Sequence, residues 1–257
     1  MRTFQLINVK ADTPYERGLQ YGQQAREKII SGIEDYKVLF SETSSMSWEE
    51  IRSYALEYIN ISEKLIPDVM EEARGISIGS GTDLADIMVL NTRYEITKFS
   101  EPNECTSFSV LPQASKRNKM YVGQNWDYRA GILDNIVMIH IEEPDGMRIF
   151  GIAEAGQVIR NGFNSYGIGL CANNLQSIYD TRGTGIPVTF LRRKVLASKS
   201  FDDAFKLLVE APRSVSCNFM LASAEGKAVD LETYPGGADV IEPVEGIIAH
   251  ANHFMSF

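Results

Sequence analysis

The sequence predicts an α+β protein in which helices cover stacked antiparallel sheets. Residues 13–99 carry apolar side chains at helical spacing behind recognisable helix caps. From Cys105 onward the chain changes to short segments rich in β-forming residues, interrupted by two further helical segments. Helices followed by a run of strands, two helices and more strands is the order of an α+β architecture, and it differs from the strict alternation of a parallel α/β sheet.

The helical region divides into three segments, each with its own start signal. The first opens at Thr13, with Pro14 in its first turn. The second begins at Ser47 and has Glu50 three residues later, which is the spacing of a capping box. The third follows the turn sequence "GSG". The sequence therefore predicts helices within 13–40, 47–66 and 82–99.

The remainder of the chain predicts mainly antiparallel strands joined by short turns. The sequence "PDG" separates two of these strands, and "EG" separates two others. Two helices are predicted at 187–199 and 200–211. The predicted strands cover 105–111, 120–126, 135–143, 147–154, 166–175, 216–224, 228–234 and 246–254.

Composition and charge limit the classes of function. The chain has 257 residues, of which 44% are hydrophobic and 23% charged, as is typical of a globular domain. Its net charge of −9 argues against binding nucleic acid or an anionic membrane surface, because both need a basic surface. The first residues lack the layout of a secretion signal, and no apolar run approaches the ~20 residues that span a bilayer. We expect a cytoplasmic protein.

The three cysteines do not form the pattern of a disulfide framework, because they are sparse and odd in number. No CxxC or HExxH motif accompanies the three histidines, so neither a metal nor another cofactor is predicted. An isolated free cysteine is most often a small buried apolar residue, and we assign that role to Cys171 and Cys217.

Cys105 differs because of the hairpin that it opens. If residues 105–111 pair with 120–126 symmetrically about Ser115 and Lys116, residue 105 faces Trp126. Asp127 then lies next to Cys105, and a thiol and a carboxylate meet at one rim of the sheet.

Two ways of activating the thiol are open. A cysteine thiol has a pKa of about 8.5, and only the thiolate is an effective nucleophile. His250 or His253 could act as the base of a Cys–His peptidase. Alternatively, cleavage between Glu104 and Cys105 would create an α-amine with a pKa of ~7.7–8.0, which can serve as the base. The second route would explain the long helical segment before Cys105 as a pro-segment.

Five motifs, in order along the chain, resemble one known family. "ECTSF", "GQNWDY", "EAGQVIRNGFNSYGIGLCANNL", "IPVTFLRRKVL" and "HANHF" are similar to the acyl-coenzyme A:6-aminopenicillanate acyltransferase family, also called isopenicillin N acyltransferase-like. The segment "LADIMVLNTRYEI" resembles the part of that family that precedes the nucleophile. The resemblance covers nearly the whole chain. It implies an N-terminal nucleophile hydrolase with a four-layer αββα fold.

The resemblance also implies roles for individual residues. Cys105 stands at the nucleophile's place, so chain cleavage is expected between Glu104 and Cys105. Asp127 matches the acidic residue that orients the amine and assists processing. Asn252 matches an oxyanion donor, and Asn173 matches a further asparagine after the corresponding strand. A side-chain amide suits an oxyanion because it donates without carrying charge.

Two expectations about the chain follow. Residues 1–104 form a helical pro-segment that packs on a catalytic core at 105–257. The family continues past its "HxNH" motif with further strands, helices and an arginine near the nucleophile, whereas this sequence ends at Phe257. We therefore expect the core to be incomplete at its C-terminus.

The predicted function is a self-processing cysteine amidohydrolase or acyltransferase. Its substrate would be a small linear amide or acyl thioester, and an S-acyl enzyme would be the intermediate. Two alternatives stay open: an uncut Cys–His peptidase-like enzyme, and a non-catalytic binding relative of the family.

Overall fold

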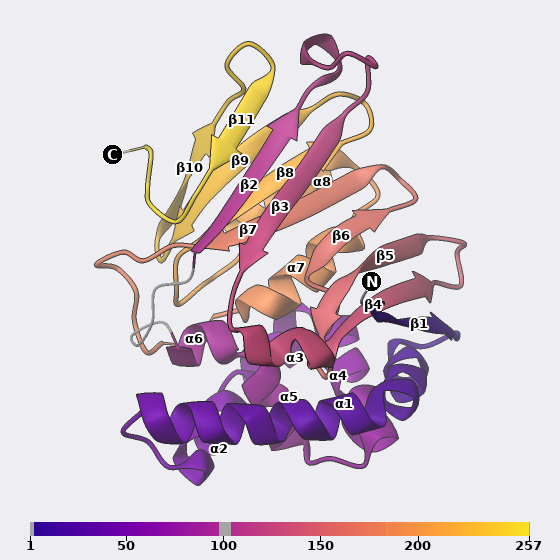
Figure 1. The fold of residues 1–257 in the computed structure, drawn as a ribbon, viewed down its shortest axis with the longest axis vertical. Coiled ribbons are helices and arrows are strands. Elements are labelled where there is room, and N and C mark those ends of the chain that lie inside the picture. Colours follow the sequence, from indigo (N-terminus) through magenta and orange to yellow (C-terminus); the bar gives the residue numbers. More distant parts are fainter. Residues whose placement is uncertain (1–2, 98–103, 184, 257) are drawn as a thin grey trace.

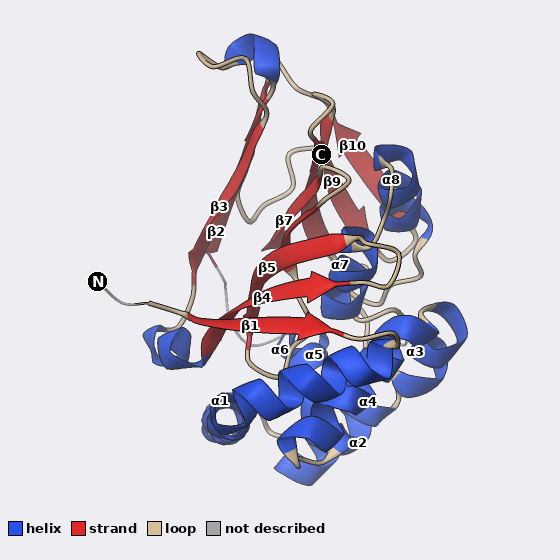
Figure 2. Cartoon of the chain, turned by 90° about the vertical axis from the view of Figure 1, so that its right-hand side faces the viewer, coloured by secondary structure: helices blue, strands red, loops and turns tan. Residues whose placement is uncertain are grey.

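The computed structural model of the chain describes residues 3–97, 104–183 and 185–256 (Figure 1). Three layers are stacked in it: helices, an eight-stranded sheet and a three-stranded sheet, as Figure 2 shows from the side. The α+β class and the two stacked sheets are confirmed.

The first-layer helices that start at Pro14, Trp48 and Leu84 begin where the sequence predicted, whereas the helix Pro67–Ser80 was not predicted. Both capping boxes are formed, by Thr13 with Glu16 and by Ser47 with Glu50. The predicted second helix is divided near Tyr58 into two shorter ones. The part of the predicted third helix beyond Thr97 lies outside the described residues. These helices are α1 (Pro14–Thr43), α2 (Trp48–Leu56), α3 (Ile59–Leu65), α4 (Pro67–Ser80), α5 (Leu84–Asn91) and α6 (Arg93–Thr97).

The backbones of helices α1 and α4 are in direct contact where the helices cross, because glycines lie at the crossing. A Cβ atom added to Gly75 would lie 2.0 Å from the carbonyl oxygen of Tyr15, and one added to Gly18 would lie 2.0 Å from that of Glu72. Backbone atoms cannot yield as a flexible side chain can, so only glycine fits at these two positions.

The large sheet has the order β1-β4-β5-β6-β7-β8-β9-β10. Neighbouring strands from β4 to β10 are antiparallel, whereas β1 pairs in parallel with β4. The sequence did not predict β1, β6 or β10. The strands are β1 (Gln5–Lys10), β4 (Ile136–Glu142), β5 (Arg148–Glu154), β6 (Asn161–Asn164), β7 (Ile168–Asn174), β8 (Cys217–Ser223), β9 (Ala228–Tyr234) and β10 (Gly237–Ile241).

Two more helices, α7 (Val188–Leu196) and α8 (Phe201–Glu210), match the prediction and lie on the same face of the large sheet as the first helical layer (Figure 2). Short 3-10 turns, η1 (Pro112–Ala114) and η2 (Ala130–Asn135), flank β3.

The small sheet carries the hairpin that the sequence singled out. Its order is β11-β2-β3, with strands β2 (Glu104–Val110), β3 (Tyr121–Asp127) and β11 (Ile247–His250). Cys105 is the register partner of Trp126, so the predicted pairing is confirmed. The predicted last strand ends earlier, at His250, and leaves Asn252 in the following turn.

The main hydrophobic core joins the helical segment to the large sheet. Buried side chains of α1 and α4, such as Ile29 and Ile76, belong to one cluster with Ile139 and Leu221 of the sheet. A smaller cluster between the sheets includes Cys171. The helices therefore pack against the large sheet, and the division into a pro-segment and a catalytic core at Glu104–Cys105 stays a prediction.

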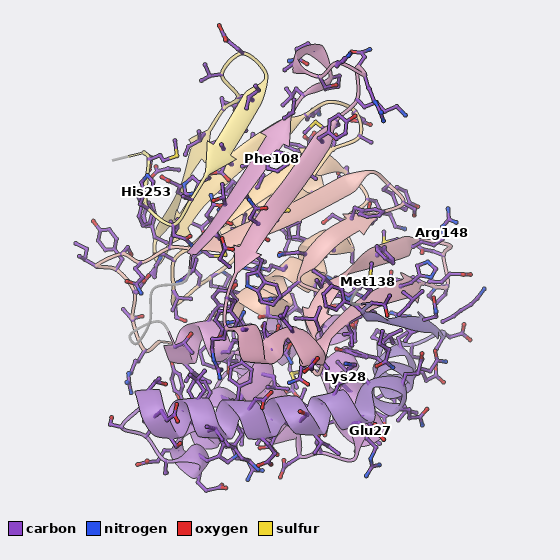
Figure 3. All side chains as sticks on the ribbon, viewed as in Figure 1. Glu27, Lys28, Phe108, Met138, Arg148 and His253 are labelled. Carbon is purple, nitrogen blue, oxygen red and sulfur yellow. The ribbon has the colours of Figure 1, made fainter. Side chains whose placement is uncertain are left out.

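The outer face of the small sheet is open in the described part of the chain. Phe108, Tyr121 and Ile247 lie on this face and are 39%, 41% and 49% exposed. Figure 3 labels Phe108 on the side of β2 that faces the viewer. No helix from residues 3–97, 104–183 or 185–256 covers this face, so the fourth layer of the αββα fold stays a prediction. No described helix is long and apolar enough to cross a membrane.

Candidate active site

Cys105 lies near the start of the central strand of the small sheet. Its side chain faces the large sheet and is 7% exposed. Its backbone N–H donates to Oδ1 of Asn252, and Nδ2 of Asn252 donates to the carbonyl of Asn174 at 2.8 Å. Because a carbonyl can only accept and an N–H can only donate, these two partners fix which way the Asn252 amide points. The turn after β11 is thereby joined to Cys105 and to the end of β7.

Asn173 is fully buried beside this pair and connects several elements. Its Nδ2 donates to Ser107 Oγ at 2.9 Å, to the His250 carbonyl at 2.9 Å and to the Ala251 carbonyl at 3.1 Å. Its Oδ1 accepts from Gln124 Nε2 at 2.9 Å. All its polar atoms therefore have protein partners, and this arrangement suits a residue that braces the site more than one that contacts substrate.

Asp127 reaches Cys105 through its backbone. Its backbone N–H faces the Cys105 sulfur and acts to lower the pKa of that thiol. In register it pairs with Glu104, and strand alternation puts its side chain on the face of β3 opposite to that of Trp126. The residue is exposed at the end of the strand. The structure thus brings together Cys105, Asn173, Asn252 and the backbone of Asp127, with the Asp127 carboxylate at the rim.

The thiol of Cys105 is held in its neutral form by its surroundings. Burial raises the pKa of Cys105, and this effect exceeds the opposing effects of the Asp127 N–H and of the positive charges of Arg192, Arg160 and Arg93. A base is therefore needed to make the thiolate.

The three arginines form a buried cluster that the sequence reading did not identify. Arg93, Arg160 and Arg192 are at most 1% exposed. Glu154 pairs with Arg93 at 3.1 Å and with Arg160 at 3.4 Å. The guanidinium of Arg160 also lies over the Trp126 ring, 3.9 Å from its centroid. The sequence gives no signal of their burial, since polar residues adjoin all three arginines, as in "NTRYE", "VIRNG" and "LRRK". The cluster adds positive charge near the nucleophile, where negative charge would develop in acyl transfer.

Neither histidine of the "HANH" motif is placed to activate the thiol. Both ring nitrogens of the buried His250 have other partners, Glu232 Oε1 at 2.6 Å and the Ala251 carbonyl at 2.8 Å. His253 is exposed and stacks on the His250 ring with centroids 6.3 Å apart. Figure 3 shows His253 beside the chain after β11.

The other two cysteines have structural surroundings. Burial raises the pKa of Cys171 to about 12, and this thiol lies in the apolar cluster between the sheets. Cys217 donates its S–H to the Asn173 carbonyl at 3.3 Å. Within the described ranges, no group of three or more His, Cys, Asp or Glu side chains could hold a metal ion.

Trp126, opposite Cys105, is one wall of an apolar groove of about 390 Å³ at the edge of the stacked sheets. Tyr128 stacks on this indole with ring centroids 5.9 Å apart. The other lining side chains include Met138, Phe150 and Cys171.

Known proteins resemble this chain in sequence. The family model described as acyl-coenzyme A:6-aminopenicillanic acid acyl-transferase matches residues 114–256. The 40 kDa form of acyl-coenzyme A:6-aminopenicillanic-acid-acyltransferase from Emericella nidulans is 27% identical over 247 residues, which are 95% of this chain and 68% of that protein.

Two solved structures show a more distant similarity. One is an N-acylethanolamine-hydrolyzing acid amidase ortholog from Caenorhabditis elegans, with 16% identity and a TM-score of 0.48 over 58% of this chain and 70% of that chain. The other is penicillin V acylase from Agrobacterium tumefaciens, with 12% identity and a TM-score of 0.32 over 57% of this chain and 43% of that chain.

Proposed function

Because the chain belongs to the acyl-coenzyme A:6-aminopenicillanic acid acyltransferase family, we propose that it is a self-processing cysteine amidohydrolase or acyltransferase. It would act on a linear C–N amide or an acyl thioester through an S-acyl enzyme. The single observation that carries this proposal is the contact between the backbone nitrogen of Cys105 and the side chain of Asn252.

This contact acquires a catalytic meaning if the chain is cut before Cys105. The backbone nitrogen would then become an α-amine with a pKa of ~7.7–8.0, next to its own thiol. Asn252 Oδ1 accepts a hydrogen bond from this nitrogen, so it would hold the amine and leave the lone pair to take the thiol proton. The Asp127 carboxylate, at the end of β3, would orient the amine from the rim.

Processing would use the same thiol. Its sulfur would attack the carbonyl carbon of Glu104, the C–N bond to Cys105 would break, and the nitrogen would take up the proton. Water would then hydrolyse the resulting thioester and release residues 1–104 as a separate chain. The Glu104–Cys105 bond lies at the start of β2, directly beside the thiol that would cleave it.

In the reaction with substrate, the thiolate would attack the acyl carbon. The remaining N–H of the Asn252 amide is the side-chain donor for the tetrahedral oxyanion, and the buried arginines favour the negative charge. The leaving amine or thiol would take the proton held by the α-amine. Water or an amine acceptor would then attack the S-acyl group.

The substrate proposed is a small acyl compound. The relative from Emericella nidulans is named for an acyl-coenzyme A donor and 6-aminopenicillanic acid as acceptor, and we extend only the classes, an acyl donor and an amine, to this chain. No metal or organic cofactor is required by these steps. All three cysteines are free, which fits our proposal of a reducing, cytoplasmic location.

The uncut Cys–His alternative is disfavoured by one observation, namely that both nitrogens of His250 are occupied by partners other than Cys105. The non-catalytic alternative is left to experiment.

Intact-mass measurement and N-terminal sequencing of the expressed protein test the proposal. We expect two chains, one beginning at Met1 and one at Cys105, and a single uncut chain for Cys105→Ala. Cys217→Ala is the matched control and should be cut normally. A single chain that nevertheless turns over amide would exclude the N-terminal nucleophile mechanism.

A further inference from the structure

His250 occupies a buried position between the two sheets. It is the last residue of β11, is 2% exposed, and pairs in register with Ser107 of β2. Its ring extends toward β9 of the large sheet, where Glu232 Oε1 lies 2.6 Å and Asp230 Oδ2 lies 3.7 Å from Nε2. An imidazole in this position is too constrained to serve as a mobile base.

The partners of His250 assign its protons. The Ala251 carbonyl, 2.8 Å from Nδ1, can only accept, so Nδ1 carries a hydrogen. Glu232 also accepts from the backbone N–H groups of Met255 at 2.5 Å and Ser256 at 3.0 Å, which are the partners of an ionised carboxylate. This ionised carboxylate lies 2.6 Å from Nε2 and holds that side of the ring in place.

Two carboxylates face the Nε2 side of the ring. They are Glu232 and Asp230, both on β9, and His253 is the other titratable group in contact, through ring stacking. Asn218 Nδ2 donates to Asp230 at 2.6 Å. Four hydrogen bonds to Glu232 lower its pKa despite burial, which keeps it ionised.

The hydrogen on Nδ1 connects His250 to the segment that contacts the nucleophile. It is donated to the carbonyl of Ala251, the residue directly before Asn252. The same carbonyl accepts from Asn173 Nδ2 at 3.1 Å. The peptide that carries Asn252 is thus held by two donors, and the Asn252 amide in turn contacts the nitrogen of Cys105. Rotation of this peptide would move the Asn252 amide away from Cys105.

We propose that His250 is a positioning residue, which is held between Glu232 and the Ala251 carbonyl and sets the Asn252 amide against Cys105. This inference rests on the proposed function, since it concerns the rate of the reaction at Cys105. In this role the Nδ1 hydrogen of His250 holds the Ala251 carbonyl, and Glu232 keeps the ring in the orientation that allows it.

Two substitutions separate the two ends of the ring. The side-chain nitrogen of Asn is the same number of bonds from Cβ as Nδ1 of His. The side-chain nitrogen of Gln is one bond further away, as Nε2 of His is. His250→Asn therefore keeps a donor for the Ala251 carbonyl and loses Glu232. His250→Gln keeps a partner for Glu232 and loses the donor to Ala251. The pair is matched because both variants replace the ring with a side-chain amide.

The experiment uses the processed protein and p-nitrophenyl acetate as an activated ester. The burst of p-nitrophenolate counts competent Cys105 thiols, and the steady state gives turnover per counted thiol. We expect His250→Gln to lower kcat per site about 100-fold with KM within a few-fold, the size of effect that a displacement of about 1 Å can have. The kcat per site of His250→Asn should be at least tenfold higher than that of His250→Gln.

The outcomes decide between the proposals. Equal losses in both variants, a smaller loss in His250→Gln, or normal turnover per site in both would overturn the positioning role, because His250 would then serve only the contact with Glu232 or the fold. Melting temperatures of both variants show how much of any effect is stability. If the wild-type protein gives no burst although Cys105 is the N-terminus, the proposed function fails instead, and the two failures are distinguishable.

Discussion

The amide of Asn252 should contribute to turnover through both of its ends, and substitution can separate them. Oδ1 accepts from the Cys105 nitrogen, and Nδ2 donates to the Asn174 carbonyl at 2.8 Å with one hydrogen left over. Asn252→Ala removes both ends. The loss of one oxyanion donor costs about 10²–10³ in kcat, or ~2.7–4 kcal/mol, and we expect a decrease of at least this size with KM within a few-fold.

Asn252→Asp removes only the donor and adds a negative charge beside the amine. The carboxylate would still accept from the Cys105 nitrogen, so the amine stays in place. It would also favour the ammonium form and raise the pKa of the α-amine, so the rising limb of the pH–rate profile should move to higher pH. Asn252→Ala should lower the rate without that displacement.

The assay is turnover per burst-titrated thiol, which removes the contribution of misfolded protein. Loss of the amide removes its hydrogen bonds with the Asn174 carbonyl and the Cys105 nitrogen, so the free energy of unfolding should also fall by about 1–3 kcal/mol. Normal turnover per titrated site in Asn252→Ala, whatever its stability, would refute the assignment of Asn252 to the mechanism.

Three further changes have expected outcomes. Gly75→Ala should lower the unfolding free energy by about 1–3 kcal/mol or more, because its Cβ would lie 2.0 Å from a backbone oxygen of α1, while Gly131→Ala, with nothing within 4 Å, should have little effect by urea denaturation. Arg160→Gln should move the alkylation of Cys105 by iodoacetamide to higher pH, since a positive charge that lowers the thiol pKa is lost; an unchanged midpoint would contradict this. Burial raises the pKa of Asp230 from 3.8 to about 6. Between these two values the folded state keeps a proton that the unfolded state releases, so stability falls as the pH rises. The free energy of unfolding, relative to that of Asp230→Asn, should therefore fall by on the order of 2–3 kcal/mol between pH of about 4 and 6.

Local signals in the sequence determined most of the elements correctly. The capping boxes at Thr13 and Ser47 involve residues three apart, and they form as expected. The symmetry of the hairpin was enough to pair Cys105 with Trp126, because register in a hairpin follows from its turn. Three of the four asparagine, aspartate and cysteine positions taken from the family resemblance, Cys105, Asn173 and Asn252, lie together with their side chains in the site.

The strands that the sequence did not predict depend on distant partners. Only Ile7 and Val9 of β1 are buried, and the strand forms by parallel pairing with β4, more than a hundred residues away. Strand β6 has four residues and lies between β5 and β7, where pairing and not composition defines it. Hydrophobic periodicity assigns arginines to the solvent-exposed surface. It therefore could not indicate that Arg160 is buried beside Glu154, or that Arg192 is buried beside Tyr94.

The two chains that cleavage would produce should remain associated, because they share the core of the molecule. Tyr36 of α1 donates to Glu154 at 2.7 Å, and Arg93 pairs with the same carboxylate at 3.1 Å. Asn91 donates to the Gly156 carbonyl at 2.9 Å. Strand β1 also belongs to the large sheet, and the helices bury their apolar faces against it.

Separation of these chains would expose this core and would remove Arg93 from the surroundings of Cys105. Because the helices and the large sheet share one hydrophobic core, the contact between the two chains would be apolar, as in an obligate complex. Native mass spectrometry of processed protein should therefore show one 1:1 complex whose mass equals that of the uncut chain plus one water. Free 105–257 chain that turns over substrate as fast as the complex would show that the helical segment is dispensable after cleavage, and that Arg93 takes no part in the field around the thiol.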